Sequence, residues 1–193
     1  DNIAAYLVYG TDVKYSGDVD LSSGFVEIVN DNATYDLYVT SFGDINNDGY
    51  IDIGIADPDY APAPGQNFGA IYIYYGSKDR FNDQITLAEA DAKIIGGVSD
   101  NYLGTSMSEI SGDINGDSYD DIVIGTTYYS EGRKAFLGAV YIFYGSSQEF
   151  SGTINVSSFD AKFIGERSYD YLGDEIIMTD LNGDSYDDLI LNS

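Results

Sequence analysis

Short apolar runs recur along the chain, each bounded by glycine, aspartate or asparagine. Runs of four to six residues rich in Ile and Val are typical of buried β-strands. A second type of run alternates Tyr or Phe with Ile or Val at every other position, which predicts strands with two different faces. Helical periodicity is almost absent, and only residues 82–92 could form a helical turn or two. The runs are IDIGIA from Ile51, DIVIGT from Asp121 and DLILN from Asp188, with AIYIYYG at 70–76 and AVYIFYG at 139–145 for the second type.

These runs belong to a repeating unit. FGAIYIYYG at 68–76 returns as LGAVYIFYG at 137–145, and DAKIIG at 91–96 returns as DAKFIG at 160–165, both after 69 residues. An acidic string occurs three times, at 43–52, 112–121 and 179–188, spaced by 69 and 67 residues. Three independent strings at one spacing indicate internal repeats. Four predicted strands in each repeat favour the blades of an all-β propeller, with antiparallel strands.

The repeat boundaries predict two whole blades between two half blades. The expected parts of this single region are a half blade over 1–32, blades over 33–101 and 102–170, and a half blade over 171–193. A closed propeller usually needs four to eight blades. We therefore expect either a piece of a larger propeller or half blades that neighbouring chains complete.

The amino-acid composition excludes several kinds of site and disfavours several kinds of partner. The chain has 193 residues, 33 acidic against 8 basic, and a formal net charge of −25, which disfavours nucleic acid and anionic membranes as partners. It has no His and no Cys, which excludes His-dependent triads, the usual zinc sites and disulfides. No apolar run approaches the length of about 20 residues that a membrane helix needs. We expect no membrane insertion and no enzymatic activity.

The acidic strings have the spacing of calcium-binding loops. Side-chain oxygens stand at positions 1, 3, 5 and 9, and position 7 can offer its backbone carbonyl. Calcium binds six to eight hard oxygen ligands, which carboxylates, amides and carbonyls supply. Three Ca²⁺ sites are therefore predicted, at Asp44, Asn46, Asp48, Tyr50 and Asp52; at Asp113, Asn115, Asp117, Tyr119 and Asp121; and at Asp180, Asn182, Asp184, Tyr186 and Asp188.

These loops are not EF-hands, because position 12 is Ile or Leu instead of Glu and strands follow instead of helices. Magnesium is disfavoured, since it prefers few protein ligands and strict octahedral geometry. Position 6 is Gly49 in the first loop but Ser118 and Ser185 in the others. If position 6 needs a positive φ, the second and third loops should bind calcium more weakly than the first.

At these residues the chain resembles the FG-GAP repeat, the blade of the integrin alpha-subunit propeller and of its microbial relatives. The acidic strings, the GAIYIYYG and GAVYIFYG strands, LGTS at 103–106 and LGDE at 172–175 carry the resemblance, which covers essentially the whole chain. The GAP tripeptide departs from the pattern, as Ala56-Asp57-Pro58 and Gly125-Thr126-Thr127. The resemblance implies an extracellular or cell-surface adhesion module with structural calcium sites. The lack of cysteine makes a microbial surface protein the closer match.

The loops expected opposite the calcium loops are rich in tyrosine and acidic residues. Tyrosine beside Asp and Asn suits stacking on sugars and hydrogen bonding to them, and it equally suits binding to a protein. The leading hypothesis is a calcium-stabilised interaction module that could also self-associate through half-blade edges. The alternative is a glycan-binding propeller, either free or attached to a carbohydrate-active enzyme. Two N-glycosylation triplets begin at Asn32 and Asn155. The candidate ligand face consists of Tyr60, Tyr128, Tyr129, Tyr169 and Tyr171.

Overall fold

The computed structural model describes residues 3–12, 14–21, 25–30, 37–97, 101–108 and 111–193. This part of the chain is all-β, and its only helical elements are two 3₁₀ turns, η1 (Leu87–Glu89) and η2 (Val156–Ser158). The strands are β1 (Ile3–Leu7), β2 (Val26–Asn30), β3 (Tyr38–Gly43), β4 (Asp52–Asp57), β5 (Ala70–Tyr74), β6 (Gln84–Thr86), β7 (Ala92–Ile95), β8 (Ser106–Met107), β9 (Ile122–Thr126), β10 (Ala139–Phe143), β11 (Gly152–Asn155), β12 (Ala161–Ile164), β13 (Ile176–Thr179) and β14 (Asp188–Leu191).

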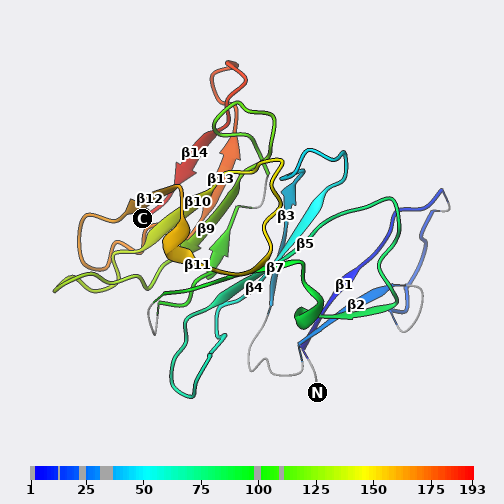
Figure 1. Cartoon of the computed structure of the whole chain (residues 1–193), viewed down its shortest axis with the longest axis horizontal. Helices are drawn as coiled ribbons and strands as arrows, with labels where there is room; N and C mark the ends of the chain where they lie inside the picture. The colour runs from blue at the N-terminus through cyan, green and yellow to red at the C-terminus, as the bar shows by residue number, and fades with distance from the viewer. Residues whose placement is uncertain (1–2, 13, 22–24, 31–36, 98–100, 109–110) are drawn as a thin grey trace.

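The strands form four sheets that follow one another in chain order, and in Figure 1 the first lies on the right, the second in the centre, and the third and fourth on the left. Their strand orders are β1-β2-β6, then β11-β7-β5-β4-β3, then β12-β10-β9-β8, and finally the pair β13-β14. The two central sheets each contain four antiparallel strands in meander order, which is the organisation of propeller blades. The all-β, blade-type fold class is confirmed, and the sheets that the described residues form do not close into a ring.

The apolar core lies between successive sheets. In β5, Ile71 and Ile73 pack with Ile122 and Ile124 of the next sheet. The alternate residues Tyr72 and Tyr74 pack on the opposite face, in a cluster that includes Val26 and Ile28 of the preceding sheet. The period-two alternation of this strand therefore separates two interfaces, and both of its faces are buried. A third cluster joins β9 and β10 to β13.

Two glycines allow neighbouring sheets to approach closely. A Cβ on Gly69, at φ +74°, would lie 2.3 Å from the backbone nitrogen of Leu103, and one on Gly138, at φ +73°, would lie 2.1 Å from that of Leu172. The same junctions are joined by hydrogen bonds from the Leu103 N–H to Phe68 O and from the Leu172 N–H to Leu137 O. The glycine of each aromatic strand string is thus required by the contact between repeats.

One strand in each repeat was missed by the sequence analysis. β6 pairs in parallel with β2, and β11 pairs in parallel with β7, so each belongs to the sheet of the preceding repeat. The segment that could form a helical turn or two, 82–92, contains one, the 3₁₀ turn η1, and this turn follows the strand β6. The blade boundaries predicted from the sequence remain a prediction.

Candidate functional site: the acidic loops and an aromatic surface

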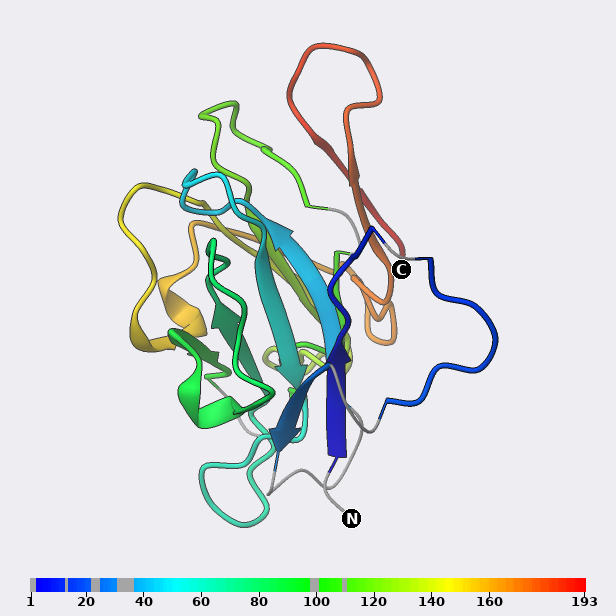
Figure 2. The same cartoon turned by 90° about the vertical axis from the view of Figure 1, so that its right-hand side faces the viewer.

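The three acidic loops project from the same end of their sheets, at the top of Figure 1. Each connects the first two strands of its sheet, because the chain leaves β3, β8 or β13 and returns in β4, β9 or β14. The loop over residues 58–69 projects from the opposite, lower end in both Figure 1 and Figure 2. The acidic loops and the loop that contains Tyr60 therefore lie at opposite ends of the molecule.

The first aspartate of each loop accepts the backbone N–H groups of positions 5 and 6 of its own loop, and in the second and third loops it also accepts that of position 4. Asp44 Oδ1 accepts from the N–H of Asp48 at 2.9 Å, and Asp44 Oδ2 accepts from that of Gly49 at 2.8 Å. Asp113 accepts in the same way from residues 117 and 118, at 3.1 and 2.7 Å. Asp180 does so from residues 184 and 185, at 3.2 and 2.9 Å. The three loops therefore share one backbone turn.

The residues at positions 3 and 5 add to this turn. Asn46 Oδ1 accepts from the N–H of Asp48 at 3.2 Å, and Asp48 Oδ1 accepts from that of Tyr50 at 2.9 Å. The equivalent bonds are present in the second and third loops. Side-chain oxygens from positions 1, 3 and 5 thus face the backbone of the same turn in every copy, including those of Asn115, Asp117, Asn182 and Asp184.

The aspartate at position 9 lies deeper. Asp52 is fully buried, and its two oxygens accept from the N–H groups of Ile45 at 3.0 Å and Gly76 at 2.8 Å. Asp121 is also buried and bonds Ile114 and Gly145 in the same way, at 2.9 and 3.0 Å. Burial raises the pKa of both carboxyl groups to about 6. In the third loop Asp188, which is only half-buried, accepts from the N–H of Leu181 at 3.1 Å.

The donor chemistry of the loops fits calcium. Within the described residues, no three acidic side chains stand close enough to form a metal site on their own. The side chains instead order the turn, and an ionised carboxylate has about four lone-pair positions, so oxygens that accept one or two N–H groups keep further capacity. The ligands would come from the side chains at positions 1, 3, 5 and 9 and from the carbonyl at position 7, of Tyr50, Tyr119 or Tyr186. These are hard oxygens, which calcium prefers.

Two positions of every loop adopt a left-handed backbone. Position 4 has φ of 54° at Asn47, 76° at Gly116 and 78° at Gly183. Position 6 has φ of 92° at Gly49 and 73° at both Ser118 and Ser185. The premise that position 6 needs a positive φ is confirmed. Each loop therefore has one glycine and one other residue at these two positions, and Asn tolerates the conformation better than Ser.

A carboxylate links each acidic loop to the loop before it. Asp120, at position 8 of the second loop, accepts the N–H of Asp44 at 2.8 Å and donates its own N–H to the Asp44 carbonyl at 3.2 Å. Asp187 makes the same pair of bonds with Asp113, at 2.9 and 3.0 Å. At position 8 of the first loop stands Ile51, which is 59% exposed. The sequence analysis did not identify this role of position 8.

Three of the five predicted face tyrosines come together. Tyr128 makes edge-to-face contacts with the rings of Tyr102, Phe136 and Tyr171, at centroid distances of 5.4 to 6.3 Å. Phe136 also stacks on Tyr171 and contacts Tyr169. Tyr169 and Tyr128 are 64% and 42% exposed. We call Tyr102, Tyr128, Phe136, Tyr169 and Tyr171 the aromatic cluster.

Four of the five residues in the aromatic cluster have a left-handed backbone, and Tyr128 alone does not. Non-glycine residues in this region carry strain of about 1–3 kcal/mol each, and such strain is concentrated at functional sites. The sequence analysis missed Tyr102 and Phe136. Tyr102 could have been found, because the string YLG occurs at both 102 and 171.

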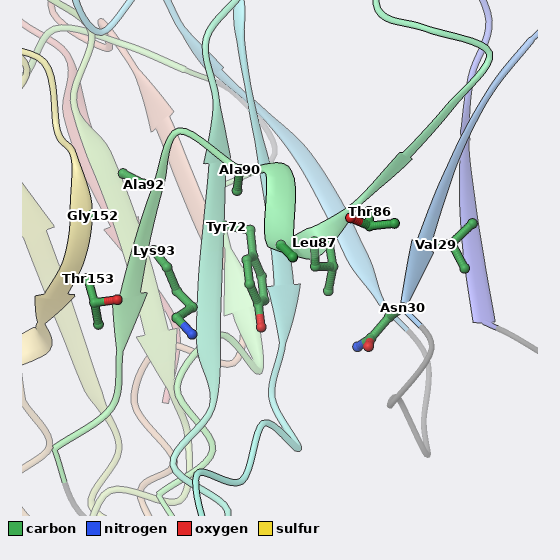
Figure 3. A pocket seen from close by; sticks show the side chains of 11 residues that line it. Val29, Asn30, Tyr72, Thr86, Leu87, Ala90, Ala92, Lys93, Gly152 and Thr153 are labelled. Atoms are coloured by element: carbon green, nitrogen blue, oxygen red, sulfur yellow. The ribbon is translucent and has the colours of Figure 1, made fainter.

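Tyr60 and Tyr129 do not join the aromatic cluster. A lysine instead contacts the face of each ring. Lys93 Nζ lies 4.5 Å from the centroid of the Tyr60 ring, and Lys162 Nζ lies 3.7 Å from that of the Tyr129 ring. Burial lowers the pKa of Lys162. Each of these lysines lines a cavity between neighbouring repeats, of about 460 Å³ beside Lys93 and about 370 Å³ beside Lys162. Figure 3 shows the first cavity, with Tyr72 and Lys93 on one side and Asn30 on the other.

Comparison with known proteins agrees with this architecture. Residues 108–143 match the FG-GAP repeat. Human integrin alpha-6 is 34% identical over 113 residues, which cover 58% of this chain and 9% of that protein. Bovine phosphatidylinositol-glycan-specific phospholipase D is 29% identical over 154 residues, covering 78% of this chain and 17% of that protein. Mouse integrin alpha-7 is 29% identical over 161 residues, covering 82% and 12%.

The chain therefore contains an FG-GAP repeat and is similar in sequence to integrin alpha chains. It spans only 9% of the integrin and 17% of the phospholipase. No helix among the described residues is long and apolar enough to cross a membrane.

Proposed function

We propose that this chain is a calcium-stabilised interaction module that works outside the cell. In this proposal three Ca²⁺ ions occupy the acidic loops and stiffen one end of the sheets, while the aromatic cluster binds a partner. The observation that carries the proposal is the turn that all three acidic loops share, with oxygens from positions 1, 3 and 5 directed to the same backbone segment. The similarity to integrin alpha chains supports the extracellular location.

The acidic loops carry neighbouring negative charges that a bound cation would neutralise. Three carboxylates stand within nine residues in the first loop and four in each of the other two, in a chain whose net charge is already −25. Like charges at this spacing repel one another, and Asp52 and Asp121 are also buried. Three calcium ions would offset six of the excess negative charges and would supply a partner for the buried carboxylates. Bound calcium should therefore stabilise the folded state.

Thermal unfolding with calcium and with chelator tests the metal sites. We expect the chelator to lower the melting temperature by many degrees at matched ionic strength, and added calcium, but not an equal concentration of magnesium, to restore it. The variant Asp48→Ala, which removes the side-chain ligand at position 5, should lose part of the calcium-dependent increase. A melting temperature that is identical with calcium and with chelator would refute the three sites.

We propose binding and not catalysis, because Asp52 and Asp121, the two carboxylates whose pKa burial raises to about 6, are engaged by backbone N–H groups of the loops. The partner of the aromatic cluster could be a protein or a glycan. The exposed rings of Tyr128 and Tyr169 favour keeping a glycan as the second candidate, since sugars stack on such rings.

A panel of neutral and acidic polysaccharides separates the two partner classes. A glycan partner predicts binding that disappears in Tyr128→Ala, which removes a ring that contacts three others in the cluster. The matched control is Tyr38→Ala, a tyrosine on β3 that is 51% exposed and lies outside the cluster. If no polysaccharide binds, or if both variants bind equally, the glycan candidate is wrong.

A further inference from the structure

Position 8 of an acidic loop lies between two of its predicted calcium ligands. In the second loop, Asp120 stands between the carbonyl of Tyr119 at position 7 and the carboxylate of Asp121 at position 9. The Asp120 carboxylate accepts the N–H of Asp44 at 2.8 Å, and the Asp120 N–H donates to the Asp44 carbonyl at 3.2 Å. Asp44 is the predicted ligand at position 1 of the first loop. Asp120 therefore connects two ligands of its own loop to a ligand of the loop before it.

The second and third loops are connected in the same way. Asp187 stands between Tyr186 and Asp188 of the third loop, and it makes the equivalent two bonds with Asp113, at 2.9 and 3.0 Å. Asp113 is the predicted ligand at position 1 of the second loop. The three loops therefore form a series, in which the following loop holds both backbone polar groups of a position-1 aspartate.

The glycine that precedes position 1 makes room for this connection. A Cβ on Gly43 would clash with the carboxylate of Asp120, and a Cβ on Gly112 would clash with that of Asp187. Both carboxylates therefore pack directly against the backbone of the preceding loop, where any side chain would displace them. The sequence Gly-Asp at the start of the first and second loops fits this close approach.

A second connection joins the first loop to the second. The N–H of Gly145 donates to Asp121 Oδ1 at 3.0 Å, and the next N–H, of Ser146, donates to the carbonyl of Ile45 at 3.0 Å. Two consecutive residues after β10 therefore bond the position-9 ligand of the second loop and the backbone of the first loop beside Asp44. Both connections begin at, or next to, a predicted ligand.

We propose that the three acidic loops bind calcium cooperatively, because each position-8 carboxylate couples its own loop to the preceding one. An occupied second loop holds Tyr119 and Asp121 in place, and with them Asp120. The backbone of Asp44 is then already ordered, so the first loop loses less conformational entropy when it binds its own ion. Such coupling is reciprocal, and it typically changes affinity by about fivefold or more. This inference rests on the proposed function, since it requires calcium in the loops.

Each loop contains a glycine whose amide reports on that loop alone. Calcium titration of the isotope-labelled 193-residue chain, followed by NMR through these amide signals, gives the midpoint of each loop separately. The reporting bonds are Gly49 N–H to Asp44 at 2.8 Å, Gly116 N–H to Asp113 at 2.6 Å and Gly183 N–H to Asp180 at 2.7 Å.

Removing calcium binding from the second loop tests the coupling. The variant Asp117→Ala lacks the ligand at position 5, and we expect it to raise the midpoint at Gly49, in the first loop, by about fivefold. In an Asp120→Ala background the same change should raise this midpoint only about twofold, because one of the two connections is lost. The matched control is Asp120→Asn, which removes the same charge but keeps an oxygen that can accept the Asp44 N–H. The effect of about fivefold should remain in that background.

The direction of the change separates the explanations. An unchanged or lower midpoint at Gly49 in Asp117→Ala would overturn the proposal, since independent loops give no change and repulsion between ions in neighbouring loops gives a lower midpoint. Equal results in the Asp120→Ala and Asp120→Asn backgrounds would also overturn it. If all three amides shift with calcium but without coupling, only this inference fails. If none of them shifts and the melting temperature does not depend on calcium, the proposed function fails as well.

Discussion

The packing of the second acidic loop against the third can be tested by replacing a single glycine with alanine, which adds one methyl group. Gly116, at position 4 of the second loop, has φ +76°, and a Cβ added there would lie 2.3 Å from Cε1 of the Tyr186 ring in the third loop. Gly183 occupies the same position of the third loop at φ +78°, but a Cβ added to it meets nothing within 4 Å. Gly49, at φ +92°, is also open. The variants Gly116→Ala, Gly183→Ala and Gly49→Ala therefore share the backbone strain, and only the first adds a clash.

The strain of alanine in the left-handed region is about 1 kcal/mol, so Gly183→Ala and Gly49→Ala should each lower the free energy of unfolding by about that amount. Gly116→Ala must also displace the Tyr186 ring. Because this ring is 51% exposed, it can swing toward solvent, which places the added cost near the low end of overpacking, about 1 kcal/mol. The expected total for Gly116→Ala is about 2 kcal/mol.

Urea unfolding followed by circular dichroism, at constant calcium, measures these free energies. In a Tyr186→Ala background, which keeps the backbone carbonyl at position 7, the cost of Gly116→Ala should fall to that of Gly183→Ala. This change is the coupling energy between the two loops. If Gly116→Ala costs no more than the two open controls in the wild-type background, the ring of Tyr186 does not pack on the second loop.

Three further changes test other parts of the structure. Ser118→Gly should tighten calcium binding at the second loop by about fivefold, because it removes about 1 kcal/mol of backbone strain; unchanged affinity in a calorimetric titration would show that this strain does not affect the site. Asp120→Ala removes the acceptor of the Asp44 N–H and should lower the free energy of unfolding by about 1–3 kcal/mol. The control Ile51→Asp, at the equivalent exposed position of the first loop, should change it by less than about 0.5 kcal/mol. Equal effects of the two variants in urea unfolding would contradict the link between loops. Burial raises the pKa of Asp57 above its ordinary value, so the folded state binds this proton more tightly than the unfolded state. The contribution of Asp57 to the free energy of unfolding therefore rises as pH falls from neutral toward 4. Unfolding of Asp57→Asn between pH 7 and 4 should lack this part of the increase, and parallel pH profiles for the two proteins would refute it.

Much of the local structure could be predicted from the sequence. The three acidic strings fold into the same turn because the bonds from positions 1, 3 and 5 join residues at most five positions apart, such as Asp44 and Gly49. The period-two alternation of residues 70–76 gives a strand whose faces pack against different sheets. Both features depend on local spacing, which a sequence displays directly.

Contacts between repeats could not be predicted in the same way. QIT at 84–86 and TIN at 153–155 contain one apolar residue each, so their patterns are too short to predict strands, and their partners lie more than 50 residues earlier in the chain. Asp52 belongs to the acidic string by spacing, and only the approach of the Gly76 N–H from the end of β5 shows that its carboxylate is buried.

The sequence by itself determined the repeat, the all-β architecture and the position of every acidic loop, because these follow from composition and spacing within one unit. Only the tertiary structure decided which residues of different repeats meet. It separated Tyr60 and Tyr129 from the aromatic cluster by placing lysines against their rings, and it added Phe136 to the cluster. The physical reason is that packing between sheets joins side chains that are distant along the chain, and burial there depends on which partner strand is present.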